Sequence, residues 1–203
     1  MIQFDGTAFQ VGNLLLFERL NATPATPHWA TTVAVVIAEW LIVVIPAMLV
    51  REWLRGGDQE RRGLLEMLLA VLLALGIAQV VTHLWPQPRP FMIHAGFQFL
   101  PHDADPGLPS DHVTVFWSMA CAALLTRRFA QWTVPLLALG LVVGWSRVFL
   151  GVHFPYDVAA ALPVAILGAA LARSLRLPME PAYAAGLRVW TCIARTVWSR
   201  RGG

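Results

Sequence analysis

The 22 residues at positions 29–50, WATTVAVVIAEWLIVVIPAMLV, contain a single charged side chain, Glu39. A helix of about 20 apolar residues crosses the hydrocarbon core of a bilayer, where it satisfies its backbone hydrogen bonds internally. Four more apolar runs follow, at 63–82, 112–126, 132–149 and 156–172. The sequence therefore predicts an all-α integral membrane protein, a bundle of about five transmembrane helices.

Composition agrees with a membrane location. The chain has 203 residues, of which 57% are hydrophobic and 13% charged, whereas soluble domains average about 25% charged. This length favours one domain over 1–203, with the transmembrane core at 29–172. The start, MIQFDGTAFQ, has no recognisable secretory signal. Cys121 and Cys192 show neither metal-ligand spacing nor a disulfide framework.

All 15 basic residues are arginine, and their positions predict the orientation of the chain. Twelve follow the first, third or fifth apolar run: Arg51, Arg55, Arg61, Arg62, Arg127, Arg128, Arg173, Arg176, Arg188, Arg195, Arg200 and Arg201. An excess of basic residues marks the cytoplasmic side, so the C-terminus is expected there. Membrane orientation explains the positive charge, and no nucleic-acid partner is predicted. Arg19, Arg89 and Arg147 fall on the outer side, so membrane orientation does not explain their presence and each calls for a separate explanation.

Two flanking segments have amphipathic character. In the outer-face segment 1–27, FQVGNLLLFERLNATP favours an interfacial helix, the alternative being a short re-entrant piece. The tail 177–203 has a basic face and three large aromatics, Tyr183, Trp190 and Trp198. It favours an amphipathic helix on the anionic cytoplasmic surface, the alternative being a partly disordered basic tail.

The first of three polar patches on the outer side is THLWPQPRPF at 82–91. Its prolines, Pro86, Pro88 and Pro90, stiffen the chain and stop the preceding helix. Arg89 lies between two of them. A rigidly held guanidinium suits bidentate binding of a phosphate, although anchoring to lipid headgroups is an alternative.

The second patch, at 109–112, introduces an apolar run with Pro109, Ser110, Asp111 and His112. This pattern predicts a helix N-terminus, whose free amides and positive dipole end bind anions. Plain capping by Ser110 or Asp111 is the alternative, but capping does not require the histidine.

The third patch, SRVFLGVHFPYD at 146–157, joins the last two apolar runs. Pro155 suits the first turn of a helix, which brings Asp157 close to His153. A carboxylate on one imidazole nitrogen leaves the other free to attack. The three patches together supply phosphate-binding arginines, a histidine nucleophile and a histidine acid, which is the equipment for phosphoryl transfer without a metal.

These patches resemble the three-part signature of the type 2 phosphatidic acid phosphatase superfamily, KxxxxxxRP, PSGH and SRxxxxxHxxxD. The third part is complete, with Ser146, Arg147, His153 and Asp157. The second has Asp111 in place of glycine. The first keeps Arg89 and Pro90 but has Thr82 at the lysine position, followed by His83.

PSDH, HLWPQPRPF, WSRVFLGVHFPYD and LNATP are similar to the undecaprenyl-diphosphatases of the bacitracin-resistance (BcrC) type. The resemblance implies dephosphorylation of undecaprenyl diphosphate on the outer face of the bacterial inner membrane, which recycles the lipid carrier for peptidoglycan and cell-wall synthesis. The expected partners are the polyprenyl diphosphate substrate and membrane lipids. The alternatives are a phosphatase or phosphotransferase on phosphatidylglycerol phosphate, phosphatidate or lipid A, and a non-enzymatic headgroup-binding protein or transporter.

By the same resemblance, His153 is the nucleophile that forms a phosphohistidine, Asp157 orients it and His112 is the general acid. The resemblance assigns phosphate binding to Arg89, Arg147 and Ser110.

The missing lysine is replaced by His83 or Thr82, and we favour His83. Asp111 caps the helix, tunes His112 or orients an arginine.

Two acidic features remain. PHDADPG carries His102, Asp103 and Asp105, for which a solvated loop is favoured over a divalent-ion site, and no metal or cofactor is expected. Glu39 lies mid-span, where a carboxylate is expensive and marks a functional site by default. It is protonated, faces a polar cavity, or is hydrogen-bonded to a neighbouring helix.

Overall fold

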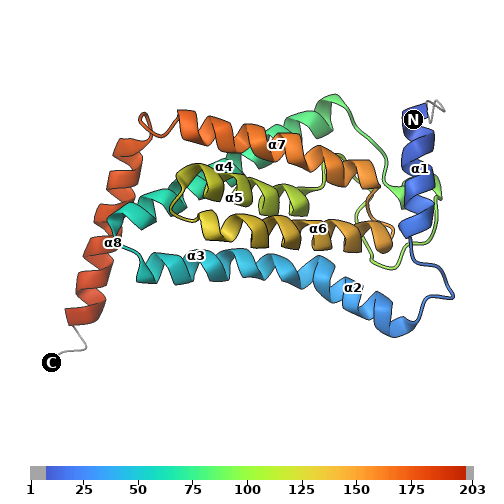
Figure 1. The fold of residues 1–203 in the computed structure, drawn as a ribbon, viewed down its shortest axis with the longest axis horizontal. Coiled ribbons are helices and arrows are strands. Elements are labelled where there is room, and N and C mark those ends of the chain that lie inside the picture. Colours follow the sequence, from blue (N-terminus) through green and yellow to red (C-terminus); the bar gives the residue numbers. More distant parts are fainter. Residues whose placement is uncertain (1–7, 200–203) are drawn as a thin grey trace.

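The computed structural model describes residues 8–199, which contain helices and no strand. The helices are α1 Ala8–Leu20, α2 His28–Trp40, α3 Val44–Arg55, α4 Asp58–Leu84, α5 Asp111–Thr126, α6 Thr133–Phe149, α7 Pro155–Ser174 and α8 Glu180–Ser199, with 3-10 turns η1 Leu41–Val43, η2 Pro90–Ile93 and η3 Ala130–Trp132. In Figure 1 the helices α2 to α7 form a bundle, and α1 and α8 cross its opposite ends. The all-α prediction is confirmed.

Four segments are long and apolar enough to cross a membrane: His28–Arg55, Asp58–Leu84, Ala130–Phe149 and Pro155–Ser174. The remaining predicted span, α5, has only 16 residues. It packs against α4, α6 and α7, and nine of its residues are buried. Because protein surrounds it, α5 does not need the full length of a lipid-exposed helix. The chain is a multi-pass membrane protein.

The first span is interrupted by η1 between α2 and α3. Pro46 follows η1 by three residues. A proline has no N–H to donate, and its ring clashes with the carbonyl four residues earlier, here that of Ile42 in η1. The local change from α to 3-10 geometry is therefore explained by Pro46.

Small residues let the central helices approach closely. A Cβ on Gly168 of α7 would lie 2.8 Å from the backbone N of Ala74 in α4, and one on Gly144 of α6 would lie 2.7 Å from Val158. Transmembrane helices associate through such small-residue contacts, because lipid is as apolar as the side chains themselves.

Helix α1 is fixed to the end of the bundle that carries the polar patches (Figure 1). The Phe17 ring is fully buried and packs edge-on against Phe154 at 5.2 Å. The Asn21 side chain donates to the carbonyls of Phe97 and Phe149 and accepts from the Phe97 amide. The LNATP segment thus joins α1 to the connection after α4 and to the C-terminal end of α6. Residues 1–7 of the expected 1–27 segment lie outside the described chain.

Helix α8 packs on the other end. Trp190 meets Trp53 of α3 edge-on at 5.8 Å, and the Arg61 guanidinium lies over both rings. Tyr183 and Leu187 are buried. The amphipathic tail is therefore helical over Glu180–Ser199 and docks on the bundle through side chains between positions 183 and 190. Arg200 and Arg201, assigned to the cytoplasmic side, are outside the residues described.

Candidate active site

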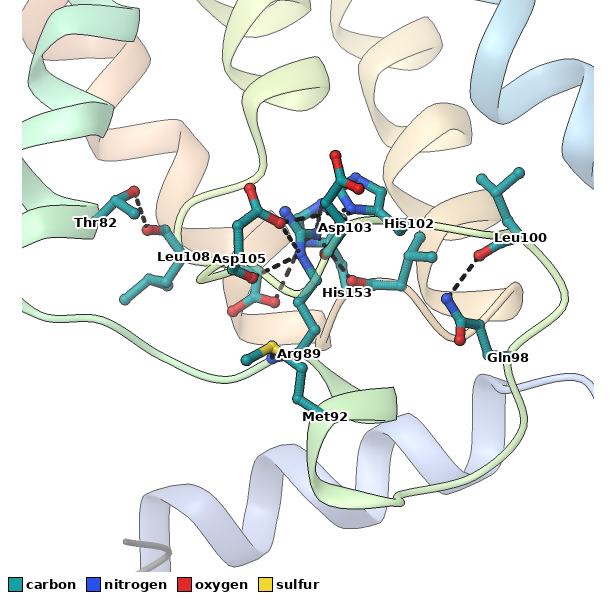
Figure 2. Close-up of polar contacts among 12 residues, drawn as sticks. Thr82, Arg89, Met92, Gln98, Leu100, His102, Asp103, Asp105, Leu108 and His153 are labelled. Atoms are coloured by element: carbon teal, nitrogen blue, oxygen red, sulfur yellow. Dashed lines mark hydrogen bonds and ion pairs between the residues drawn. The ribbon is translucent and has the colours of Figure 1, made fainter. Parts of the chain in front are cut away.

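The three polar patches meet around a cavity of about 130 Å³. Figure 2 shows Arg89, from the connection between α4 and α5, in contact with His153. The cavity is lined by Gln79, Thr82, Arg89, His102, Asp105, Pro106, Pro109, Asp111, His112, Arg147 and His153.

His153 lies in the short connection between α6 and α7, paired with Asp157 in the first turn of α7. Its Nδ1 is 3.3 Å from Oδ2 of Asp157, and the same oxygen accepts from the Phe154 amide at 2.8 Å. Both side chains are almost fully buried. Burial and the positive charge of Arg89 lower the pKa of His153 well below its usual value. The ring is therefore neutral near pH 7, as a nucleophilic imidazole must be.

Arg89 is the cation in contact with this ring. Its Nε donates to the backbone oxygen and to Oδ1 of Asp105, both at 3.0 Å. Its Nη1 donates to the Val152 carbonyl at 3.1 Å and lies 3.0 Å from Nε2 of His153. The contacts are drawn in Figure 2. The guanidinium is thus held within hydrogen-bonding reach of the oxygens of a phosphate bound to His153.

Arg147 and Ser110 contribute buried polar atoms that lack a protein partner. Arg147 is 4% exposed; its Nη1 donates to the Ala38 carbonyl at 3.2 Å, but its Nε has no acceptor. Ser110 is the N-cap residue of α5 and fully buried, yet its Oγ makes no hydrogen bond, so it does not cap by its side chain. Since buried polar atoms are normally satisfied, both atoms favour an oxygen-rich ligand.

His112 and Asp111 occupy the first turn of α5 and line the same cavity. The free amides and dipole of this helix start add to the positive field there. Asp111 lines the cavity together with Arg89 and Arg147, and it makes no side-chain hydrogen bond to any described residue.

The last turn of α4 contains the two candidates for the missing motif lysine. Thr82 lines the cavity and donates from its Oγ1 to the Leu108 carbonyl at 2.8 Å. His83, which we favoured as the lysine replacement, is exposed and does not line the cavity. The helical turn points these neighbours in different directions, so the ranking of His83 above Thr82 is not supported.

The loop PHDADPG is largely exposed, as expected for a solvated loop, but part of it also lines the cavity. His102 and Asp105 line the cavity, and Asp105 forms an ion pair with Arg89. Within residues 8–199, no group of three His, Cys, Asp or Glu side chains is arranged to hold a metal ion. The adjacency of this loop to PSDH is the signal that could have identified it, because loops next to a helix start often carry functional residues.

Glu39 faces a second cavity, of about 440 Å³. This cavity shares His102, His112 and Arg147 with the first and is otherwise lined by Glu39, Trp40, Val43, Leu100 and Pro101. Glu39 has no hydrogen bond to any described residue. Of the three alternatives for this carboxylate, its position therefore favours the one that faces a cavity.

Comparison with known proteins gives consistent matches. Residues 63–178 match the family model described as PAP2 superfamily. The putative undecaprenyl-diphosphatase YbjG of Escherichia coli is 36% identical over 190 residues, 94% of this chain and 96% of that protein. The undecaprenyl-diphosphatase BcrC of Bacillus subtilis is 36% identical over 155 residues, 76% of this chain and 79% of that protein.

Solved structures show the same fold. A crystal structure of Aquifex aeolicus LpxE superposes with a TM-score of 0.67 at 19% identity, covering 85% of this chain and 99% of that one. A PAP2-type phosphatidylglycerolphosphate phosphatase from Bacillus subtilis gives a TM-score of 0.61 at 21% identity, covering 86% and 89%. With a family match over more than half of its length and relatives of 36% identity over most of it, the chain belongs to the PAP2 superfamily.

Proposed function

We propose that this protein hydrolyses undecaprenyl diphosphate to undecaprenyl phosphate and inorganic phosphate. The single observation that supports it most is the buried His153–Asp157 pair in contact with Arg89, beside the unpartnered Nε of Arg147. The choice of lipid rests on the relatives named undecaprenyl-diphosphatase, which align with most of the chain.

The geometry supports two chemical steps. In the first, Nε2 of His153 attacks the terminal phosphorus, and the P–O bond to the bridging oxygen breaks as the N–P bond forms. His112 gives a proton to the departing undecaprenyl phosphate. In the second, His112 takes a proton from water, which attacks the phosphohistidine and releases phosphate.

The surrounding groups stabilise charge during both steps. Asp157 holds the proton on Nδ1 and offsets the positive charge that develops on the His153 ring. Arg89, Arg147 and the start of α5 with Ser110 offset the charge on the phosphate oxygens.

The proposed location is the bacterial inner membrane with the cavity facing outward. The connections that line the cavity, between α4 and α5 and between α6 and α7, lie at the α1 end of the bundle in Figure 1. The C-terminal ends of α3, α5 and α7, where most of the arginines of the cytoplasmic set occur in the sequence, lie at the α8 end. In this orientation the enzyme would return the lipid carrier to cell-envelope synthesis.

Phosphate release from a panel of purified lipids, with EDTA present, tests the proposal. We expect undecaprenyl diphosphate to be cleaved in preference to phosphatidylglycerol phosphate, phosphatidate and phosphorylated lipid A. Preference for another lipid would keep the chemistry and change the substrate. Release from none of them would favour the binding or transport function, and loss in EDTA that Mg²⁺ restores would overturn the metal-free mechanism.

A further inference from the structure

His102 lies where the two cavities meet. It lines the 130 Å³ cavity that His153 also lines and the 440 Å³ cavity at the C-terminal end of α2. Its ring centroid is 6.5 Å from that of His153. A ligand that extends from His153 towards α2 therefore lies beside the His102 ring.

The His102 ring is oriented by its own loop (Figure 2). Its Nδ1 is 3.2 Å from the Asp103 carbonyl and 3.6 Å from Oδ1 of Asp105. Asp105 is in turn fixed by Arg89, which contacts His153. Because both groups facing Nδ1 are acceptors, Nδ1 carries a proton, and Nε2 is the nitrogen left for a ligand. No residue in the described part of the chain bonds to Nε2.

The two cavities differ in what they can hold. The first is lined by Arg89 and Arg147, which suit a phosphate, whereas the second shares only Arg147 with it and adds the apolar side chains of Trp40, Val43 and Leu100. In a polyprenyl diphosphate, the phosphate next to the lipid lies between the phosphate under attack and the first isoprene unit. With the terminal phosphate at His153 and the isoprene unit at α2, that inner phosphate falls at the junction.

We propose that His102 binds the inner phosphate of a diphosphate lipid and so selects diphosphates over monophosphates. This role rests on the proposed function. In this proposal His102, a loop residue, takes the phosphate-binding role of the missing motif lysine in place of His83 or Thr82.

The charge state of His102 fits binding to the inner phosphate. In the free protein, burial and the nearby Arg89 lower the pKa of His102. The negative charges of Asp105 and of a phosphate at the junction would raise the pKa of His102 again. The ring would then take up a second proton, at Nε2. The resulting imidazolium donates a charge-assisted hydrogen bond. A monophosphate bound at His153 places no phosphate at the junction and gains nothing from His102.

The test compares His102→Ala with wild type on farnesyl diphosphate and farnesyl phosphate, a matched pair of short lipids. Loss of a hydrogen bond to a charged group corresponds to about 10- to 100-fold in affinity or rate. We expect kcat/KM for the diphosphate to fall by about this factor, with little change for the monophosphate. His94→Asn removes an exposed imidazole from the same connection, keeps a residue type that tolerates the left-handed backbone there, and should change turnover of neither substrate.

Inhibition gives a second readout that does not require monophosphate turnover. Inorganic pyrophosphate can occupy both positions, whereas inorganic phosphate needs only the first. In His102→Ala, the inhibition constant for pyrophosphate should rise while that for phosphate stays at its wild-type value, which also shows that the site remains folded. His102→Asn replaces the alanine variant if the latter does not fold.

Equal losses on both substrates, or no loss on the diphosphate, would overturn the role of His102 while leaving the proposed function intact. If wild-type protein releases phosphate from neither farnesyl nor undecaprenyl diphosphate, the proposed function itself fails. The two failures are therefore distinguishable.

Discussion

At the scale of single residues, His153 is the side chain on which phosphate release should depend most. His153→Ala removes the attacking nitrogen while leaving a small apolar side chain in a buried position. We expect phosphate release from undecaprenyl diphosphate to fall by at least about 10³-fold, as for other catalytic units that lose their nucleophile. The measurement is steady-state release from purified protein, with His94→Asn, at an exposed histidine outside the cavity, as the matched control. Turnover within about tenfold of wild type would remove His153 as the nucleophile.

Burial of His153 also predicts a pH effect on stability. Its pKa is lowered in the folded protein, so between that value and the ordinary value of about 6.5 the unfolded chain binds more protons. Stability is therefore lost as the pH falls below about 6.5, by up to about 1.4 kcal/mol per pH unit. His153→Asn lacks this contribution. The melting temperature of wild type minus that of the variant should decrease between pH 7.5 and pH 5, and a constant difference would contradict the assignment.

Local spacing explains which site residues could be predicted from the sequence. His153 and Asp157 are four apart around Pro155, and they form the expected contact. The position of His102 could not be derived in this way, because it depends on the path of the 94–110 connection and on the pairing of Asp105 with Arg89. Such a pairing is long-range, and neither charge pattern nor periodicity encodes it.

At the scale of helices, the α4–α7 contact should tolerate no additional carbon. Gly168→Ala places a Cβ 2.6 Å from that of Ala74 and 2.8 Å from its backbone, so the helices must separate, at a cost of about 1–3 kcal/mol. Gly76→Ala is the matched control, since a Cβ there meets nothing within 4 Å and alanine favours the helix by up to about 1 kcal/mol. Melting in detergent should show a loss for the first variant and none for the second; equal melting temperatures would refute the close contact.

Asn21 should contribute more to the stability of the folded protein than its place in a surface segment indicates. Its side chain makes three hydrogen bonds to Phe97 and Phe149, whereas Asn13 accepts one, from the Tyr156 amide. At about 1 kcal/mol each, Asn21→Ala should destabilise the protein more than Asn13→Ala. Hydrogen exchange in the 94–101 segment should increase only in the Asn21 variant. Unchanged exchange there would show that Asn21 does not hold this connection.

The apolar runs predicted the helices well, because span length and composition depend on local sequence alone. The run 112–126 was short for a span, and the structure supplies the reason: α5 lies among α4, α6 and α7. The docking of α8 through Trp53, Arg61 and Trp190 was not predictable, since amphipathic character alone does not distinguish a protein surface from a lipid one.

At the scale of the whole molecule, the distribution of arginine predicts opposite locations for the two ends. Asp103 is exposed in the loop at the cavity, and Cys192 is a free, exposed cysteine on α8. In intact cells, a membrane-impermeant thiol reagent should label Asp103→Cys but not Cys192, because only the cavity end is expected to face outward. Permeabilised cells should show labelling of both, and Cys192 then serves as the internal control for reactivity. Labelling of Cys192 in intact cells would invert the topology, place the cavity on the cytoplasmic side and exclude carrier recycling at the outer face.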